Sequence, residues 1–211
     1  MKKLVFSTLL FISITALHAQ SEKYVAAMKS NLELLKGAKS STDYLGVASA
    51  FERIATAEKT QWQPYYYAAL ALLHDGMNNL NADKDAAGQK VDDLLTRGEA
   101  IQKNAEFSVL HYYNETMKMT VDPQTRWQTS GVAMEKYYEQ TIAEDSTNAR
   151  IYFMKGETVF HTPESFGGGK DKAKPLFQKS VDLFGKQKPS TDFSPVWGKE
   201  EAQSMLEQCD K

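Results

Sequence analysis

The sequence predicts an all-helical protein, an α-α superhelix of about four stacked helical hairpins closed by a carboxy-terminal helix. From Glu22 onward apolar residues recur at spacings of three and four, and no segment alternates with the period of two that is typical of strands. Between Asn148 and Gly185, two such patterns flank a glycine-containing loop at 162–169. Each helix of such a hairpin must bury its apolar stripe, so consecutive hairpins are expected to stack into a solenoid with a concave face.

Residues 1–19 are predicted to be a secretory signal peptide. Lys2 and Lys3 precede an apolar run that ends at Leu17, and Ala19 offers the small side chain at which we place cleavage. The run is too short to cross a bilayer as a mature helix, and no basic cluster follows it, which disfavours the alternative of a retained membrane anchor. The mature repeat domain is therefore expected at 20–211, in the periplasm or secreted.

Composition narrows the classes of partner. The chain has 25 basic and 27 acidic residues, and removal of the signal peptide makes it more acidic. Such a mixed surface argues against nucleic-acid binding and against docking on membranes through lysine clusters. The single cysteine, Cys209, excludes an intrachain disulfide and, because it lies near the carboxy terminus, argues against a lipidated amino terminus; we interpret it as a bystander, with intermolecular pairing as the alternative.

The first four helices follow from capping and stop signals. Gly37 ends the first helix, and Ser41 and Asp43 offer caps for the second. Pro64 suits the first turn of the third, and Asp83 caps the fourth. The predicted ranges are 22–36, 44–58, 63–74 with a stop at Asp75-Gly76, and 84–102.

The second half of the chain continues the pattern. Asp122 and Pro123 begin the sixth helix after a break, and Gly185 ends the eighth. A linker follows, after which Trp197 is expected to lead a capping helix and to cover the apolar end of the stack. The predicted ranges are 106–119, 123–142, 149–160, 170–185, a linker at 186–195, and a short helix from Val196 through Leu206.

The hairpin at 148–185 also carries a family resemblance. Tyr152, Gly156 and Val159 on its first helix, with Ala173 and Phe177 on its second, resemble a tetratricopeptide repeat, a motif of ~34 residues. The resemblance extends over most of residues 22–184, although the loops are longer than the tight turn of the family. It implies helical pairs whose first helices line a concave face that binds another molecule.

The loop at 162–169 is similar to one in exported repeat proteins of Gram-negative bacteria. Some of those proteins work as periplasmic helpers of solute transporters. This resemblance implies an exported protein, and it bears on location and architecture more than on activity.

No motif indicates catalysis, a cofactor or a metal site. Gly167-Gly168-Gly169-Lys170 lacks the preceding strand, the glycine spacing and the following Ser or Thr of a phosphate-binding loop, so we interpret these glycines as a left-handed turn. His111 and Glu115 share a helix face, but two ligands do not complete a zinc site. We therefore expect no enzyme, no cofactor and no metal; catalysis remains only a third class of function.

Aromatic residues supply the candidate site. Consecutive tyrosines project about 100 degrees apart on a helix, so one member of each pair is expected to leave the core and offer contact area to a ligand; the alternative is that both pack between hairpins. Placing the first helices on the concave face gives the predicted partner-binding residues: Tyr66, Leu70, His74, Tyr112, Glu115, Arg150, Phe153, Glu157 and His161.

The leading functional hypothesis is an exported, non-catalytic scaffold or adaptor that binds a partner protein or peptide on the concave face. Rings would supply buried area, and polar groups would fix the register of the bound chain. The alternative is a periplasmic solute-transport accessory that encloses a small apolar or anionic ligand between hairpins. The sequence does not specify the oligomeric state.

Overall fold

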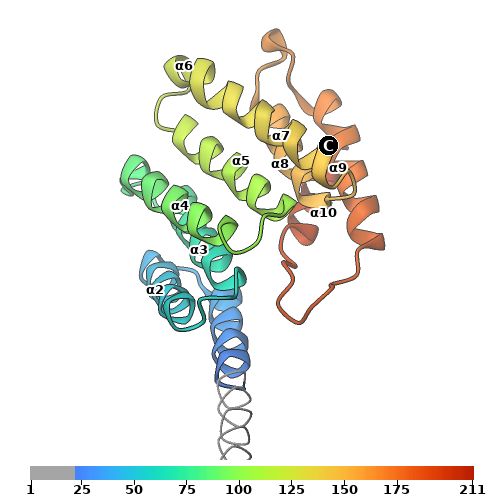
Figure 1. Cartoon of the computed structure of the whole chain (residues 1–211). Coiled ribbons are helices and arrows are strands. Elements are labelled where there is room, and N and C mark those ends of the chain that lie inside the picture. Colours follow the sequence, from blue (N-terminus) through green and yellow to red (C-terminus); the bar gives the residue numbers. More distant parts are fainter. Residues whose placement is uncertain (1–21) are drawn as a thin grey trace, which may run out of the picture.

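The computed structural model describes residues 22–211, and within that range every regular element is a helix. The helices pack in consecutive pairs along a curved array (Figure 1), which confirms the predicted all-α class of stacked hairpins. The predicted signal peptide, residues 1–19, lies outside the described residues. The elements are a helix at 22–37, α2 (Ser41–Ala57), α3 (Gln63–Asn78), α4 (Lys84–Glu99), α5 (Ala105–Met119), α6 (Pro123–Arg126), the π-helix η1 (Trp127–Gly131), α7 (Val132–Glu144), α8 (Ala149–His161), the 3-10 helix η2 (Glu164–Phe166), α9 (Lys170–Lys186) and α10 (Lys199–Cys209).

Several helix ends differ from the predicted ones: α2 begins at Ser41 rather than at 44, and α9 continues past the predicted stop at Gly185 to Lys186. Helix α3 does not stop at Gly76 but continues to Asn78, and α4 ends at Glu99 rather than at 102. Gly76 is inside the helix because it is a close-contact position, where a Cβ atom would collide with the sulfur of Met117. A glycine selected for interhelical packing thus resembles a stop signal when only the sequence is considered.

The predicted loop turn is confirmed. Gly167 and Gly169 adopt φ values of 84° and 98°, in the left-handed region that favours glycine. The amide of Gly169 donates to the carbonyl of Val159 at 2.9 Å, which ties the end of the loop back to α8. The loop therefore sets the angle at which α9 returns along α8.

Helix α3 is the centre of the first half of the molecule. It packs against α2, α4 and α5, and the side chains of Tyr65, Tyr66 and Tyr67 are all buried. The prediction that consecutive tyrosines leave one ring exposed is wrong for this triplet, because neighbours surround α3 on every side. The alternative of packing between hairpins holds here.

The predicted linker is a structural part of the core. We call residues 187–198 the strap, because they run from the end of α9 to helices near the amino terminus (Figure 1). Phe193 is buried beside Tyr24, with ring centroids 5.4 Å apart, and the hydroxyl of Tyr67 donates to the Phe193 carbonyl at 3.1 Å. The strap thereby joins the two ends of the array.

Trp197 does not cover the end of the stack as predicted. It packs against both hydrophobic clusters of the core, and its indole Nε1 donates to the hydroxyl of Tyr66 at 2.8 Å. Helix α10 packs on α9 and α8 and buries Ala202 and Leu206. The carboxy-terminal helix is thus the cap, and the tryptophan before it is a central contact.

Candidate functional site

The predicted partner-binding residues do not share one surface. Tyr66, Tyr112 and Arg150 are completely buried, and Leu70 and Phe153 are buried as well. The others are half-buried except His161, whose side chain is 71% exposed. Glu115 pairs with Lys118 at 3.0 Å, so this carboxylate is already engaged within the protein.

Arg150 has a structural role that the sequence did not reveal. Its Nη1 lies 3.0 Å from Glu106 Oε1, and its Nη2 donates to the carbonyl of Pro195 in the strap. Glu106 also accepts hydrogen bonds from Tyr66 and Asn148, at 3.2 and 2.8 Å. This buried network connects α3, α5 and α8 to the strap and fixes the position of Trp197.

Four half-buried rings from separate segments form a continuous series, which we call the ring row: Tyr44, His74, Tyr113 and Trp197. Tyr44 on α2 stacks on His74 of α3 at 5.7 Å, and His74 meets Tyr113 of α5 edge to face at 6.1 Å. Tyr113 in turn stacks on Trp197 at 6.1 Å. The row crosses the boundary between the two hydrophobic clusters, since Tyr113 and Trp197 pack against both.

The surroundings of the ring row are apolar with an acidic side. Burial lowers the pKa of His74 to about 4, which leaves its imidazole neutral at neutral pH. Burial, reinforced by Glu157, Tyr44 and Glu201, raises the pKa of the Tyr113 phenol. Burial also raises the pKa of Glu157, and nearby His161 opposes that shift. The row is therefore an uncharged aromatic surface bordered by carboxylates of α8 and α10.

The lowered pKa of His74 predicts an acid sensitivity of the ligand-free protein. Because the ordinary pKa is 6.5 and the folded value is about 4, unfolding takes up a proton between those pH values, and stability falls as the pH falls. We expect His74→Phe to remove up to about 3 kcal/mol of the stability lost between neutral pH and pH ~4. Urea unfolding of both proteins across this range measures the difference, and identical pH profiles would contradict it.

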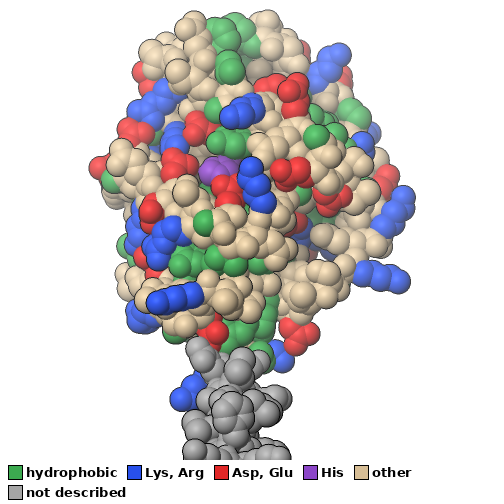
Figure 2. Space-filling view, in the orientation of Figure 1, with side chains coloured by type: hydrophobic (Ala, Val, Ile, Leu, Met, Phe, Trp, Pro, Cys, Tyr) green, Lys and Arg blue, Asp and Glu red, His purple; other side chains and the backbone are tan. Residues whose placement is uncertain are grey.

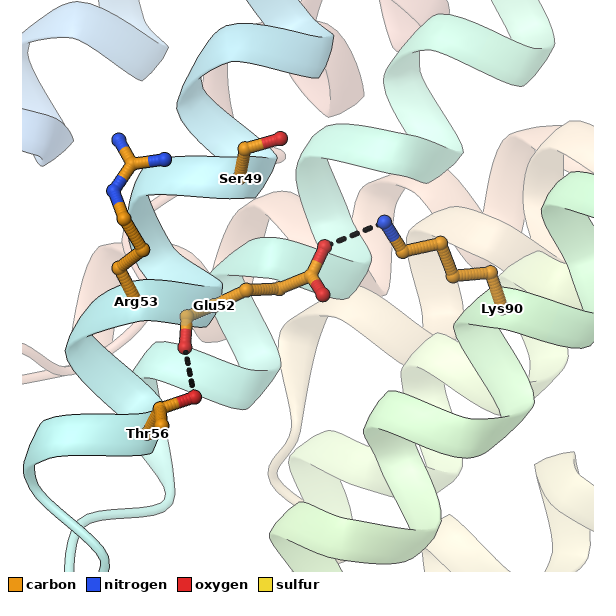
Figure 3. A pocket seen from close by; sticks show the side chains of 5 residues that line it. All are labelled: Ser49, Glu52, Arg53, Thr56 and Lys90. Atoms are coloured by element: carbon orange, nitrogen blue, oxygen red, sulfur yellow. Dashed lines mark hydrogen bonds and ion pairs between the residues drawn. The ribbon is translucent and has the colours of Figure 1, made fainter.

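Two cavities lie away from the ring row. The first, of about 380 Å³, lies between α2 and α4, and each residue that lines it has a polar or charged side chain. Figure 3 shows its residues, with Glu52 reaching Lys90 at 2.6 Å, so one of its cations is already neutralised. No aromatic ring lines this cavity.

The second cavity, of about 610 Å³, lies where the strap passes the amino ends of α5 and α8. Its volume is in the range of ligand sites. Trp62 is the one aromatic residue in its lining, where Lys103 and Lys188 are mixed with Glu144 and Asp145. The lining therefore combines apolar residues with charged residues of both signs.

Charge and metal chemistry offer no stronger candidate. Figure 2 shows basic and acidic side chains interspersed over the visible face, without a field of one sign. His111 stacks on Tyr137 at 4.8 Å and lies 3.4 Å from Glu99, but within residues 22–211 no group of three or more His, Cys, Asp and Glu side chains is arranged to hold a metal ion. None of the helices in that range is long and apolar enough to span a membrane.

Comparison with solved structures identifies the kind of protein that shares this architecture. The fold of this chain is similar to that of a haemophore. A haemophore is not an enzyme, which agrees with the prediction of a non-catalytic protein. The similar structure is the HusA haemophore from Porphyromonas gingivalis, with a TM-score of 0.80 and 29% sequence identity over 88% of this chain and 92% of that chain. No protein-family model matches the chain, and a search of curated proteins finds no match.

This comparison corrects the leading hypothesis from the sequence. A scaffold that binds a protein or peptide is wrong as the main interpretation, because the structural relative is named for carrying haem. The alternative hypothesis, a carrier of a small apolar or anionic ligand, is better supported. The physical reason is that most rings assigned to a peptide-binding face are enclosed by the strap and by neighbouring helices.

Of the four residues in the ring row, only His74 was predicted from the sequence to be a site residue. Tyr112 was predicted for the binding face, whereas it is the buried ring of its pair and donates to Thr158 at 2.8 Å. Trp197 reaches the row only because the strap folds back over the array. The pair Tyr112-Tyr113 was a sequence signal for this site, because one of its rings is enclosed and the other is half-buried, as expected for neighbours on a helix.

Proposed function

We propose that this protein binds haem or a related porphyrin and carries it outside the cytoplasm. The similarity to the HusA haemophore is the observation on which the proposal rests. The predicted signal peptide at 1–19 supports export. The alternative hypothesis from the sequence was a carrier of a small apolar or anionic ligand. A porphyrin has both properties, because it combines a broad apolar macrocycle with carboxylates.

We assign the porphyrin to the ring row. A flat macrocycle gains most from flat aromatic partners, and the row offers four rings from four segments, in contact with one another. The larger cavity offers only Trp62 and places acidic groups among its lining. Because Glu157 and Glu201 border the row at Tyr113, the porphyrin carboxylates would point away from α8 and α10.

Titration of residues 20–211 with ferric or metal-free protoporphyrin IX tests this proposal through quenching of tryptophan fluorescence. We expect saturable binding at micromolar concentrations or below, on the order of −8 kcal/mol or better. Replacing both Tyr44 and Tyr113 with Ala should weaken binding roughly tenfold to a hundredfold, since an aromatic contact contributes about 1 kcal/mol. Circular dichroism establishes that the double variant remains folded.

Two controls separate the ring row from other aromatic surfaces. Tyr138→Ala removes a half-buried ring that packs on Tyr152 at 6.2 Å, outside the row, and should leave affinity unchanged. Trp62→Ala removes the aromatic ring from the lining of the larger cavity and should also leave the affinity unchanged. Loss of binding in Trp62→Ala with full binding by the Tyr44 and Tyr113 variant would move the site to that cavity. Absence of saturable binding by the unaltered protein would refute the function.

A further inference from the structure

The larger cavity, of about 610 Å³, carries two positive charges that the protein itself leaves unpaired. Lys103 lies in the connection between α4 and α5, and Lys188 lies in the strap, so two distant segments place a cation on the same lining. Within residues 22–211 neither ammonium group makes an ion pair or a side-chain hydrogen bond. Both groups are therefore available to a bound molecule.

The three carboxylates that line this cavity are, in contrast, already hydrogen-bonded within the protein. Glu106 lies 3.0 Å from the buried guanidinium of Arg150, which offsets its charge. Asp145 accepts from the amide and the hydroxyl of Thr147 at 2.9 and 2.6 Å, and Glu144 accepts at 3.2 Å from the carboxamide one turn before it. Among the charged side chains of the lining, only the two lysines lack a partner in the described part of the chain. The lining therefore complements an anion better than a cation.

Trp62 gives the cavity a fixed aromatic wall. The indole is half-buried and meets Tyr66 and Phe107 edge to face, with ring centroids 5.8 and 5.5 Å apart. Pro189 and Pro195 of the strap add apolar surface to the lining. Ligand sites of this volume combine such apolar walls with a few polar groups that fix the orientation of the ligand. The lining thus fits a molecule that has both a flat apolar part and an anionic group.

We propose that the larger cavity is a second ligand site, separate from the ring row, which binds a small aromatic carboxylate. The ammonium groups of Lys103 and Lys188 pair with the carboxylate, and the indole of Trp62 contacts the ring. Because the two lysines come from different segments, the bound anion also ties the strap to the connection between α4 and α5. The inference goes beyond porphyrin binding, since no residue of the ring row lines this cavity.

The test compares 2-naphthoate with 2-naphthamide, two probes of nearly the same shape that differ in charge. Calorimetric titration of residues 20–211 at low salt should show naphthoate binding about tenfold or more tighter than naphthamide, and added salt should reduce the difference. Lys103→Gln combined with Lys188→Gln should weaken naphthoate binding by about tenfold and change naphthamide binding little. Trp62→Ala should weaken both probes by about fivefold, because it removes an aromatic contact without changing a charge.

Two control variants, checked for folding by circular dichroism, make the outcome specific. Lys59→Gln combined with Lys172→Gln alters two exposed lysines outside the lining, changes the net charge equally and should affect neither probe. The Tyr44 and Tyr113 double variant should retain naphthoate binding, and its loss there would place the probe on the ring row and overturn the second site. No saturable naphthoate binding, equal affinity for the two probes, or equal weakening by the control lysine pair would also overturn the inference. Each of these failures leaves the porphyrin function standing, because that function is tested with protoporphyrin IX.

Discussion

Replacing Arg150 with Ala should lower the free energy of unfolding by about 3–5 kcal/mol, because it leaves the partner carboxylate without its counter-charge. The side chain of Arg150 is 1% exposed and that of Glu106 is 16% exposed, so water cannot replace the lost partner well. The substitution also removes the hydrogen bond to the Pro195 carbonyl and the guanidinium contact 5.6 Å from the Phe184 ring. Chemical denaturation measures the change.

An exposed ion pair serves as the matched control. Lys29 pairs with Asp192 at 3.4 Å with side chains 61% and 73% exposed, so Lys29→Ala should cost no more than about 1 kcal/mol. If Arg150→Ala is as mild as the control, the buried network does not stabilise the fold. In the double variant Arg150→Met with Glu106→Gln, part of the lost stability should return, because no buried charge then lacks a partner.

Truncating Phe177 to Ala is expected to cost about 3–5 kcal/mol. Phe177 is completely buried at the contact between α8 and α9, where its ring approaches Phe153 and Phe160, each at 6.3 Å between centroids. The substitution would leave a cavity between α8 and α9, which form the hairpin at 148–185. Urea unfolding gives the change.

Gly156 supplies the test of whether this contact is a specific fit. A Cβ atom at position 156 would lie 2.6 Å from the Phe177 ring, so Gly156→Ala should cost about 1–3 kcal/mol in the natural background. In the Phe177→Ala background the added methyl enters the vacated space, so the two effects should not be additive. Additive costs would show that the glycine and the ring do not depend on each other.

The local features of the sequence were enough to predict the helical class and most helix ends. Asn148 caps α8 by accepting from the amides of Arg150 and Ile151, and Gly167 and Gly169 make the loop turn that the glycine run indicated. Such signals are readable because a cap or a left-handed glycine acts within a few residues. Gly76 shows the limit, since its role depends on Met117 on another helix.

The candidate site depended on contacts between residues distant in the sequence. His74 was predicted for a binding face, but its ring neighbours Tyr44 and Tyr113 come from other hairpins, and Trp197 bonds to Tyr66 across 131 residues. The periodicity of a single helix does not show which of its faces a later segment will cover. Tyr66 and Arg150 were therefore assigned to an open surface although the strap encloses them.

The sequence by itself determined the helices, their pairing and the turn that joins α8 to α9, because these depend on apolar spacing and capping within short stretches of chain. The tertiary structure alone decided that residues 187–198 fold back into the core and that half-buried rings from four segments meet in one row. Burial of Phe193 and the hydrogen bonds of Arg150 and Trp197 hold that arrangement, and these are long-range contacts that no local pattern encodes.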